Sequence, residues 1–258
     1  MEIITSKNNP AVVAAAKLSD KKYREKTGTF AFEGIKLFEE AHRAGVRFSR
    51  VFVTEDAYRK YEEKLSCLSR DVLTVVSEAV YGKLSFESAP QGVFCVAEYL
   101  SCEKQKDSSF VILLDGVADP GNFGAVLRSA EAFGVDTVYT GKNGADLYNP
   151  KTVRACMGSL FRTDVRRSEN IVDEIGALQK AGFRIFATAL DQRSMDIRDV
   201  DFSGKIGFVI GNEGHGVCAE AIGACDGTVI IPMHKGPESL NAAVACGVVM
   251  WEAARKRL

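Results

Sequence analysis

Residues 231–258 read IPMHKGPESLNAAVACGVVMWEAARKRL. An apolar run ends at Pro232, and the residues after Asn241 have helical spacing with small side chains on several faces. Such a helix is packed closely on most of its sides. One small domain can hardly surround a helix closely on most of its sides. The stretch therefore predicts packing against a partner subunit or within a tightly threaded chain. Ser239 is predicted to cap this helix.

The composition is that of an ordinary soluble globular protein. Hydrophobic and charged residues make up 46% and 26% of the 258 residues, and no apolar run reaches the roughly 20 residues of a membrane span. The start, MEIITSKNNP, lacks a secretory pattern, so a cytoplasmic location is expected. Seven cysteines without a CxxC pair are expected to be reduced, and three scattered histidines predict no metal site.

The formal net charge of −1 argues against a protein coated with nucleic-acid-binding charge. Two local basic stretches, KKYREK and RTDVRR, could still contact phosphates. Each of them taken singly is equally typical of a solvated charged face.

Short apolar segments alternate with helical patterns in the C-terminal part of the chain. FVILLDG, DTVYTG, FRIFATAL, KIGFVIGNE and GTVIIPM are nearly continuous in apolar character, as in strands buried on both faces. They predict an α/β domain with a parallel sheet covered by helices. Ligands of such sheets bind beyond the carboxyl ends of the strands, so the residues after each strand are the candidate site.

The first hundred residues predict a separate α/β unit. Pro10 follows two asparagines and suits a helix start, and the helical pattern continues to the region of Tyr23. TFAFEG, SRVFVTE, VLTVVS and GVFCVAEY are typical of strands, and the polar segment SCEKQKDSS follows them. The predicted domains are residues 1–102 and 110–258, joined by a linker at 103–109.

The segment VADPGNFGAVLRSAEAFG follows the first strand of the C-terminal part. A turn at residues 119–121 and a helix from Asn122 to Phe133 are predicted, which places Asn122 and Arg128 near the ligand edge of the sheet. The glycines do not match a dinucleotide-binding fingerprint. Arg128 falls among apolar residues near a predicted buried face, where an unpaired charge is costly.

The segment VIGNEGHGV also comes at the end of a strand. Gly211, Gly214 and Gly216 would let the backbone approach a ligand closely, and Glu213 offers a carboxylate at the same edge. A glycine-rich turn with a solvated glutamate is the alternative. His215 is interpreted as a turn residue.

These three segments together resemble the SpoU (TrmH) family of RNA ribose 2′-O-methyltransferases, a branch of the SPOUT class. The matching motifs are DPGNFGAVLRSAEAFG, VIGNEGHGV and IPMHKGPESLNAAVA, in that order. The N-terminal sequence NPAVVAAAKLSDKKYREKTGTFAFEGIKLFEEA is similar to a substrate-binding domain, related to ribosomal proteins L30e and L7Ae, that many members carry. The resemblance covers nearly the whole chain.

The resemblance implies a SPOUT methyltransferase domain with a deep trefoil knot, preceded by a small L30e-like α/β domain. It implies S-adenosylmethionine as the methyl donor, RNA as the substrate and a homodimer with the active site near the subunit interface. One departure concerns the loop after Met233, where members commonly have a glycine two residues on. This chain has Lys235 there, followed by Gly236.

The resemblance also assigns site residues by position. The donor-binding set comprises Thr188, Ala189, Gly211, Ile231, Met233 and Leu240. The catalytic or near-catalytic set comprises Asn122, Arg128, Glu213, Ser239 and Asn241. The predicted RNA contacts of the N-terminal domain are Lys7, Lys21, Lys22 and Arg24.

The difficult part of methyl transfer to a ribose hydroxyl is the weak nucleophile. The family proposal makes Arg128 the general base, but an arginine stays protonated. We therefore expect Arg128 to bind a substrate phosphate and to stabilise the developing alkoxide, while a phosphate oxygen or a water takes the proton. Asn122 would orient the ribose, and Glu213 would hold Arg128 or Asn122 in place.

The predicted function is S-adenosylmethionine-dependent 2′-O-methylation of a ribose in structured RNA. Ribosomal RNA is favoured over transfer RNA because of the N-terminal domain. One alternative is a non-catalytic RNA-binding or ribosome-assembly protein on the same scaffold. A second is a dinucleotide-dependent oxidoreductase, which the missing fingerprint disfavours.

Overall fold

The computed structural model describes most of the chain, namely residues 3–101, 108–191, 193–234 and 239–256. The chain divides into two compact units, which are described separately. Unit 1 consists of residues 1–101 and 146–161, and unit 2 of residues 102–145 and 162–258. The segment 146–161 thus belongs to unit 1 although it interrupts unit 2 in the sequence. Most of the predicted linker at 103–109 lies outside the described residues.

Unit 1 is built on a mixed sheet of five strands, β1 (Ile3–Ile4), β2 (Thr29–Glu33), β3 (Phe48–Thr54), β4 (Leu73–Val76) and β5 (Val93–Glu98). Their order is β1-β4-β3-β5-β2. β4 is parallel to β1 and β3, whereas β5 is antiparallel to β3 and β2. The sequence predicts all of these except β1, which is too short to show a pattern.

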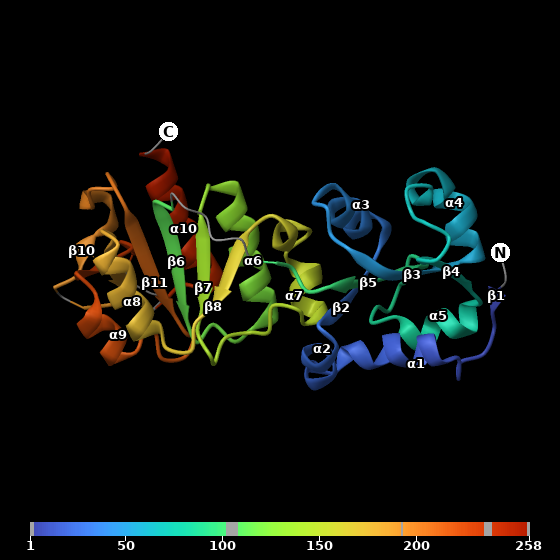
Figure 1. The fold of residues 1–258 in the computed structure, drawn as a ribbon. Helices are drawn as coiled ribbons and strands as arrows, with labels where there is room; N and C mark the ends of the chain where they lie inside the picture. The colour runs from blue at the N-terminus through green and yellow to red at the C-terminus, as the bar shows by residue number, and fades with distance from the viewer. Residues whose placement is uncertain (1–2, 102–107, 192, 235–238, 257–258) are drawn as a thin grey trace. The chain divides into compact units, whose positions relative to one another are not determined.

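The helices of unit 1 are α1 (Pro10–Ala16), α2 (Lys21–Thr27), α3 (Ile35–Arg43), α4 (Glu55–Leu65), α5 (Glu78–Leu84) and α7 (Pro150–Ala155). α1 and α5 pack together on one face of the sheet, and α3 and α4 cover the other face (Figure 1). Asn9 caps α1 and Pro10 takes its first position. The single helix predicted as far as Tyr23 is in fact divided, because a short 3₁₀ turn separates α1 from α2.

A buried ion pair holds the segment 146–161 to the rest of unit 1. The Arg24 side chain is 2% exposed, and its guanidinium donates to the Asp146 carboxylate at 2.5 Å and to two backbone carbonyls. Tyr148 stacks on Tyr99 with ring centroids 4.0 Å apart. The prediction that Arg24 contacts RNA is wrong, because its charge is buried and already paired.

Unit 2 is built on seven strands, β6 (Phe110–Asp115), β7 (Thr137–Thr140), β8 (Asp164–Arg167), β9 (Arg184–Thr188), β10 (Met195–Asp196), β11 (Ile206–Gly211) and β12 (Gly227–Ile230). Their order is β10-β12-β9-β11-β6-β7-β8, and every neighbouring pair is parallel. The predicted parallel sheet is confirmed. The sequence does not predict the two edge strands: β8 is rich in charged residues, and β10 is only two residues long.

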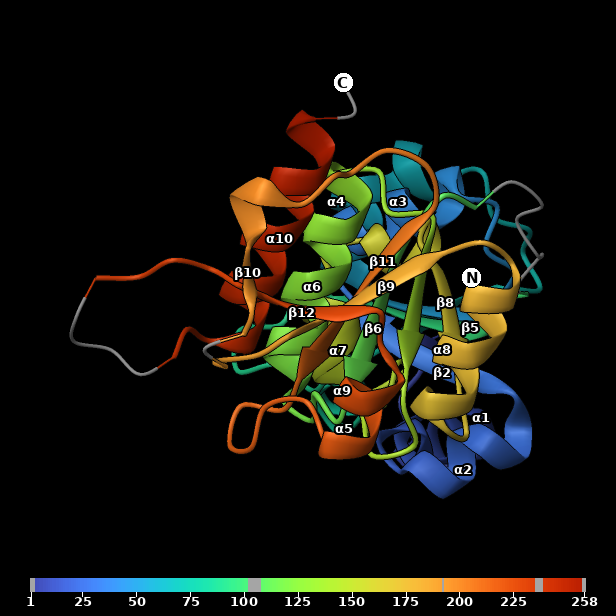
Figure 2. The ribbon, with the colours of Figure 1, turned by 90° about the vertical axis from the view of Figure 1, so that its left-hand side faces the viewer.

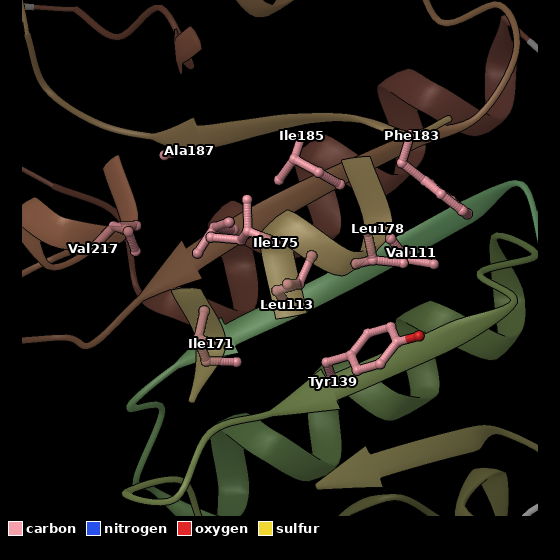
Figure 3. Packing of buried hydrophobic residues seen from close by; sticks show 12 residues of the cluster. Val111, Leu113, Tyr139, Ile171, Ile175, Leu178, Phe183, Ile185, Ala187 and Val217 are labelled. Atoms are coloured by element: carbon pink, nitrogen blue, oxygen red, sulfur yellow. The ribbon is translucent and has the colours of Figure 1, made fainter. Parts of the chain in front are cut away.

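The helices of unit 2 are α6 (Pro120–Ala132), α8 (Ile171–Lys180), α9 (Ala219–Ala224) and α10 (Ala242–Arg255). α8 packs with α9, and α6 packs with α10 on the other side of the sheet (Figure 2). Ile171, Ile175 and Leu178 of α8 lie over Leu113 and Ile185 of the sheet (Figure 3). Burial of such a cluster stabilises the unit by roughly 1.5–3 kcal/mol for each large side chain.

The last helix, α10, returns from β12 to lie against α6 and β11. Small residues such as Ala242, Cys246 and Ala253 are buried in this packing, whereas Val244 and Trp251 are 53% and 52% exposed. The small-residue faces of α10 therefore pack within unit 2, and two of its large apolar side chains stay on the surface.

The described cysteines carry free thiols. Burial raises the pKa of the Cys246 thiol above its ordinary value, and burial together with the nearby Asp226 carboxylate raises the pKa of Cys225 to about 12. These two thiols are thus protonated near neutral pH. Over the described part of the chain, no helix has the length and apolar character of a membrane span.

Candidate active site

The carboxyl ends of β9, β11 and β12 border a cavity of about 550 Å³. This is within the range of roughly 300–1,000 Å³ that is common for small-molecule sites. Parallel sheets bind ligands at this edge. The cavity lining includes every residue that the resemblance assigns to donor binding, namely Thr188, Ala189, Gly211, Ile231, Met233 and Leu240.

The cavity combines apolar walls with a few polar groups. Leu190, Ile222 and Val229 extend the apolar lining, and the side chains of Asp191 and Glu213 bring carboxylates to it. Apolar walls suit a flat aromatic base, and carboxylates suit a positively charged group. Asp191 was not predicted from the sequence, because it lies beyond the end of the strand motif.

Asn212 fastens the loop after β11 to the end of β6. Its side-chain amide donates to the Gly116 carbonyl at 2.9 Å, and its Oδ1 accepts from the Gly214 N–H at 2.7 Å. Its backbone N–H and carbonyl both pair with Gly216, at 3.1 and 2.9 Å. This asparagine, which determines where the neighbouring Glu213 lies, is not predicted from the sequence.

Gly211, which lines the cavity, also has a structural role that was not predicted. A Cβ atom at this position would overlap the backbone of Gly216 and Val217. The glycine is therefore required because the loop folds back on itself at this point. The loop shape and the cavity wall depend on the same contact.

We expect Gly211→Ala to weaken binding of the methyl donor by about 5- to 150-fold, because an overpacking cost of roughly 1–3 kcal/mol must be relieved by moving the loop. Isothermal titration calorimetry measures this. Gly223→Ala in α9 is the control, since a Cβ there meets no atom within 4 Å. Wild-type donor affinity for Gly211→Ala would contradict the expected coupling of loop and cavity.

Three polar side chains from distant segments form a hydrogen-bonded chain that begins in the cavity lining. The Asn122 side-chain amide donates to Glu213 Oε1 at 2.6 Å. Asn122 Oδ1 accepts from Asn241 Nδ2 at 3.0 Å. Asn241 Oδ1 in turn accepts the Ala243 and Val244 N–H groups, so both amide orientations are determined by the start of α10. We call this set the Glu213–Asn122–Asn241 chain.

Two helix starts differ from the predictions. Asn241 caps α10 in place of Ser239, which instead lines the cavity. α6 begins at Pro120 in place of Asn122, because the Asp119 carboxylate accepts the Asn122 N–H at 2.7 Å and acts as the cap. The predicted turn at residues 119–121 thus belongs to the first turn of the helix.

Arg128 is exposed on α6, and the predicted burial among apolar residues is wrong. It follows Asn122 by six residues, about 9 Å along a helix axis. It does not line the cavity. Among the described residues, Arg128 has no hydrogen-bond or ion-pair partner, so its charge is available to a group outside this chain.

The remaining predicted residues are distributed as follows. Lys7, Lys21 and Lys22 are exposed on unit 1. His215, interpreted as a turn residue, also lines the cavity. Lys235 and Gly236 lie outside the described residues. Across the described ranges, no group of three His, Cys, Asp or Glu side chains could hold a metal ion.

Two family models match the sequence. The SpoU rRNA Methylase family matches residues 109–251, and an MRM3-like substrate binding domain matches residues 9–95. This chain belongs to the SpoU rRNA methylase family. A Bacillus subtilis (strain 168) relative, 23S rRNA (guanosine(2553)-2′-O)-methyltransferase RlmP, is 33% identical over 255 residues, which are 97% of this chain and 98% of the relative.

Solved structures of SpoU members have the same architecture. An rRNA methyltransferase from Sinorhizobium meliloti aligns with a TM-score of 0.88 at 29% identity, over 100% of this chain and 98% of that one. The SpoU methyltransferase AviRb from Streptomyces viridochromogenes, solved in complex with the cofactor AdoMet, aligns with a TM-score of 0.86 at 27% identity, over 97% and 98% of the two chains. The predicted fold class is confirmed.

Proposed function

We propose that this protein transfers a methyl group from S-adenosylmethionine to a ribose 2′-hydroxyl of ribosomal RNA. The observation that carries the proposal is the Glu213–Asn122–Asn241 chain, which begins in the lining of a cavity of suitable size. The relative RlmP is named for 2′-O-methylation of a guanosine in 23S rRNA. This name supports ribosomal RNA as the substrate here.

The cavity fits the proposed donor. S-adenosylmethionine supplies a methyl group activated by attachment to a positively charged sulfur. Ile231, Met233 and Leu240 would enclose the adenine and the donor chain, and Glu213 brings negative charge to the same lining. The Asp191 carboxylate also lies in the lining but is paired with the Arg193 guanidinium at 3.0 Å. The Thr188 hydroxyl is held by the Val209 carbonyl at 3.1 Å, so this wall is positioned before a ligand arrives.

The Glu213–Asn122–Asn241 chain would orient the substrate ribose. Asn122 is held from both sides, so its remaining hydrogen-bonding capacity points in a defined direction. Arg128 would bind the phosphate beside the target nucleotide and stabilise negative charge developing on the 2′-oxygen. The proton would pass to a phosphate oxygen or a water, because arginine stays protonated.

The proposal includes a homodimer. Arg128 does not line the cavity of its own chain, and Val244 and Trp251 expose apolar surface on the helix that packs against α6. A two-fold interface over these helices would cover the apolar side chains and could bring Arg128 to the cavity of the partner subunit. A cytoplasmic location and a domain boundary at residues 102–110 belong to the same proposal.

A transfer assay tests this function. We expect the purified protein to transfer a radiolabelled methyl group from S-adenosylmethionine to ribosomal RNA, with the label recovered in a 2′-O-methylated nucleoside after digestion. Transfer should be lost when the target nucleotide carries a 2′-deoxyribose. Label recovered on a base would contradict the proposed position, and absence of transfer to both ribosomal and transfer RNA would contradict the enzyme.

A further inference from the structure

Positive charge is concentrated at the start of unit 1. Residues 5–27, which include α1 and α2, contain six basic and two acidic residues. The chain as a whole has a formal net charge of −1, so this excess is local. A local basic surface on a protein of near-zero net charge attracts a polyanion to one place and in one orientation.

Most of the basic side chains in this segment lack an acidic partner. Asp20 caps α2 by accepting the Tyr23 N–H at 2.9 Å, and Glu25 lies 3.9 Å from Lys21. Arg24 is buried against Asp146. The others are exposed and, within the described part of the chain, form no ion pair. We call this set the lysine face: Lys7, Lys17, Lys22 and Lys26.

The opposite helical layer of unit 1 differs in charge. α3 and α4 together contain five basic and six acidic residues. Several of the basic residues are neutralised in place, by Arg43–Glu40 at 2.7 Å, Lys64–Glu39 at 2.8 Å and Arg59–Glu55 at 3.2 Å. α1, α2 and α5 lie on one side of the sheet and α3 and α4 on the other (Figure 1). The two layers therefore present different electrostatic surfaces.

We infer that the substrate RNA contacts unit 1 through the lysine face and that the layer of α3 and α4 faces away from the RNA. The inference rests on the proposed function, which requires an RNA substrate. Lysines contact phosphates as point charges without reading the sequence, as expected for a domain that recognises the shape of a folded RNA. Tyr23, with Lys17 5.8 Å above its ring, lies on α2 and could stack against an unpaired base.

The salt dependence of RNA binding tests the lysine face. The slope of log affinity against log salt is negative, and we expect the triple variant Lys7→Gln, Lys22→Gln, Lys26→Gln to reduce its magnitude by about 2. Each phosphate that a lysine no longer neutralises removes roughly 0.7–0.9 from that magnitude. Fluorescence anisotropy with a labelled ribosomal RNA fragment measures the slope in the full chain. Because the donor cavity lies in unit 2, folding of unit 1 in the variant is checked by its far-ultraviolet circular dichroism spectrum and thermal unfolding, which should match those of the wild type.

The matched control removes the same charge from the other layer, with Lys36→Gln, Arg43→Gln and Lys60→Gln. We expect this variant to retain the wild-type slope. An equal loss of slope in both variants, or a wild-type slope in the lysine-face variant, would overturn the inference. If the wild-type chain methylates RNA and the lysine-face variant keeps the wild-type slope, RNA contact through the lysine face is contradicted and the proposed methyltransferase function is supported. If the lysine-face variant has a shallower slope but the wild-type chain transfers no methyl group, the proposed function is contradicted and RNA contact through the lysine face is supported.

Discussion

Asn122→Asp is expected to lower kcat at least about 100-fold while donor affinity stays within a few-fold of wild type. The Asn122 amide donates to Glu213 Oε1 at 2.6 Å, and a carboxylate in its place cannot donate while ionised. Two carboxylates at this distance cannot both ionise, so they would separate or share a proton. Either result would misplace the group that we propose orients the ribose, and losing one oriented polar group typically costs about 10²–10³ in kcat.

A second substitution makes this prediction specific. In the double variant Asn122→Asp, Glu213→Gln the new glutamine amide can donate to the new carboxylate, so the hydrogen bond returns with reversed polarity. We expect kcat of the double variant to exceed that of Asn122→Asp alone, which a double-mutant cycle detects as coupling. Independent effects of the two substitutions would contradict the proposed contact, as would near-wild-type kcat in Asn122→Asp.

Arg128→Ala is expected to lower kcat by about 100-fold or more and to leave donor affinity unchanged, because the residue does not line the cavity. Single-turnover kinetics and donor calorimetry separate the two effects. Arg128→Lys should recover little, since an ammonium does not reproduce the paired N–H donors of a guanidinium. Equal losses of kcat and donor affinity would indicate a structural role.

Mixed dimers test whether Arg128 acts across the subunit interface. In a heterodimer of Arg128→Ala and Asn122→Asp chains, one site would combine an intact Asn122 with the partner's intact arginine. An equal mixture that exchanges subunits freely should therefore regain about one quarter of wild-type activity, because half of the dimers are mixed and each has one complete site. No recovery, with subunit exchange verified, would show that each chain uses its own Arg128.

The sequence predicts the buried strands because each is a continuous apolar run. Phe110–Asp115 and Ile206–Gly211 are examples, and both lie in the middle of the sheet. The edges are not predictable in this way. The edge strand Asp164–Arg167 has a neighbouring strand on one side only and carries charged side chains, so its sequence is typical of a loop.

The site was predicted in part. The positions after the strands, including Gly211 and Glu213, do lie together because parallel strands end at one edge. Which residue caps α10 could not be predicted, since Ser239 and Asn241 are both good caps and only the backbone path selects between them. The burial of Arg24 depends on Asp146, 122 residues away, and local sequence carries no sign of it.

Mapping of 2′-O-methylated nucleotides in ribosomal RNA tests the central claim most directly. Cells with the gene, cells without it and cells that carry the Asn122→Asp variant are compared. We predict one ribose methylation that is present with the wild-type gene, absent without it and strongly reduced with the variant. An unchanged methylation map in cells without the gene would contradict the proposed activity on ribosomal RNA.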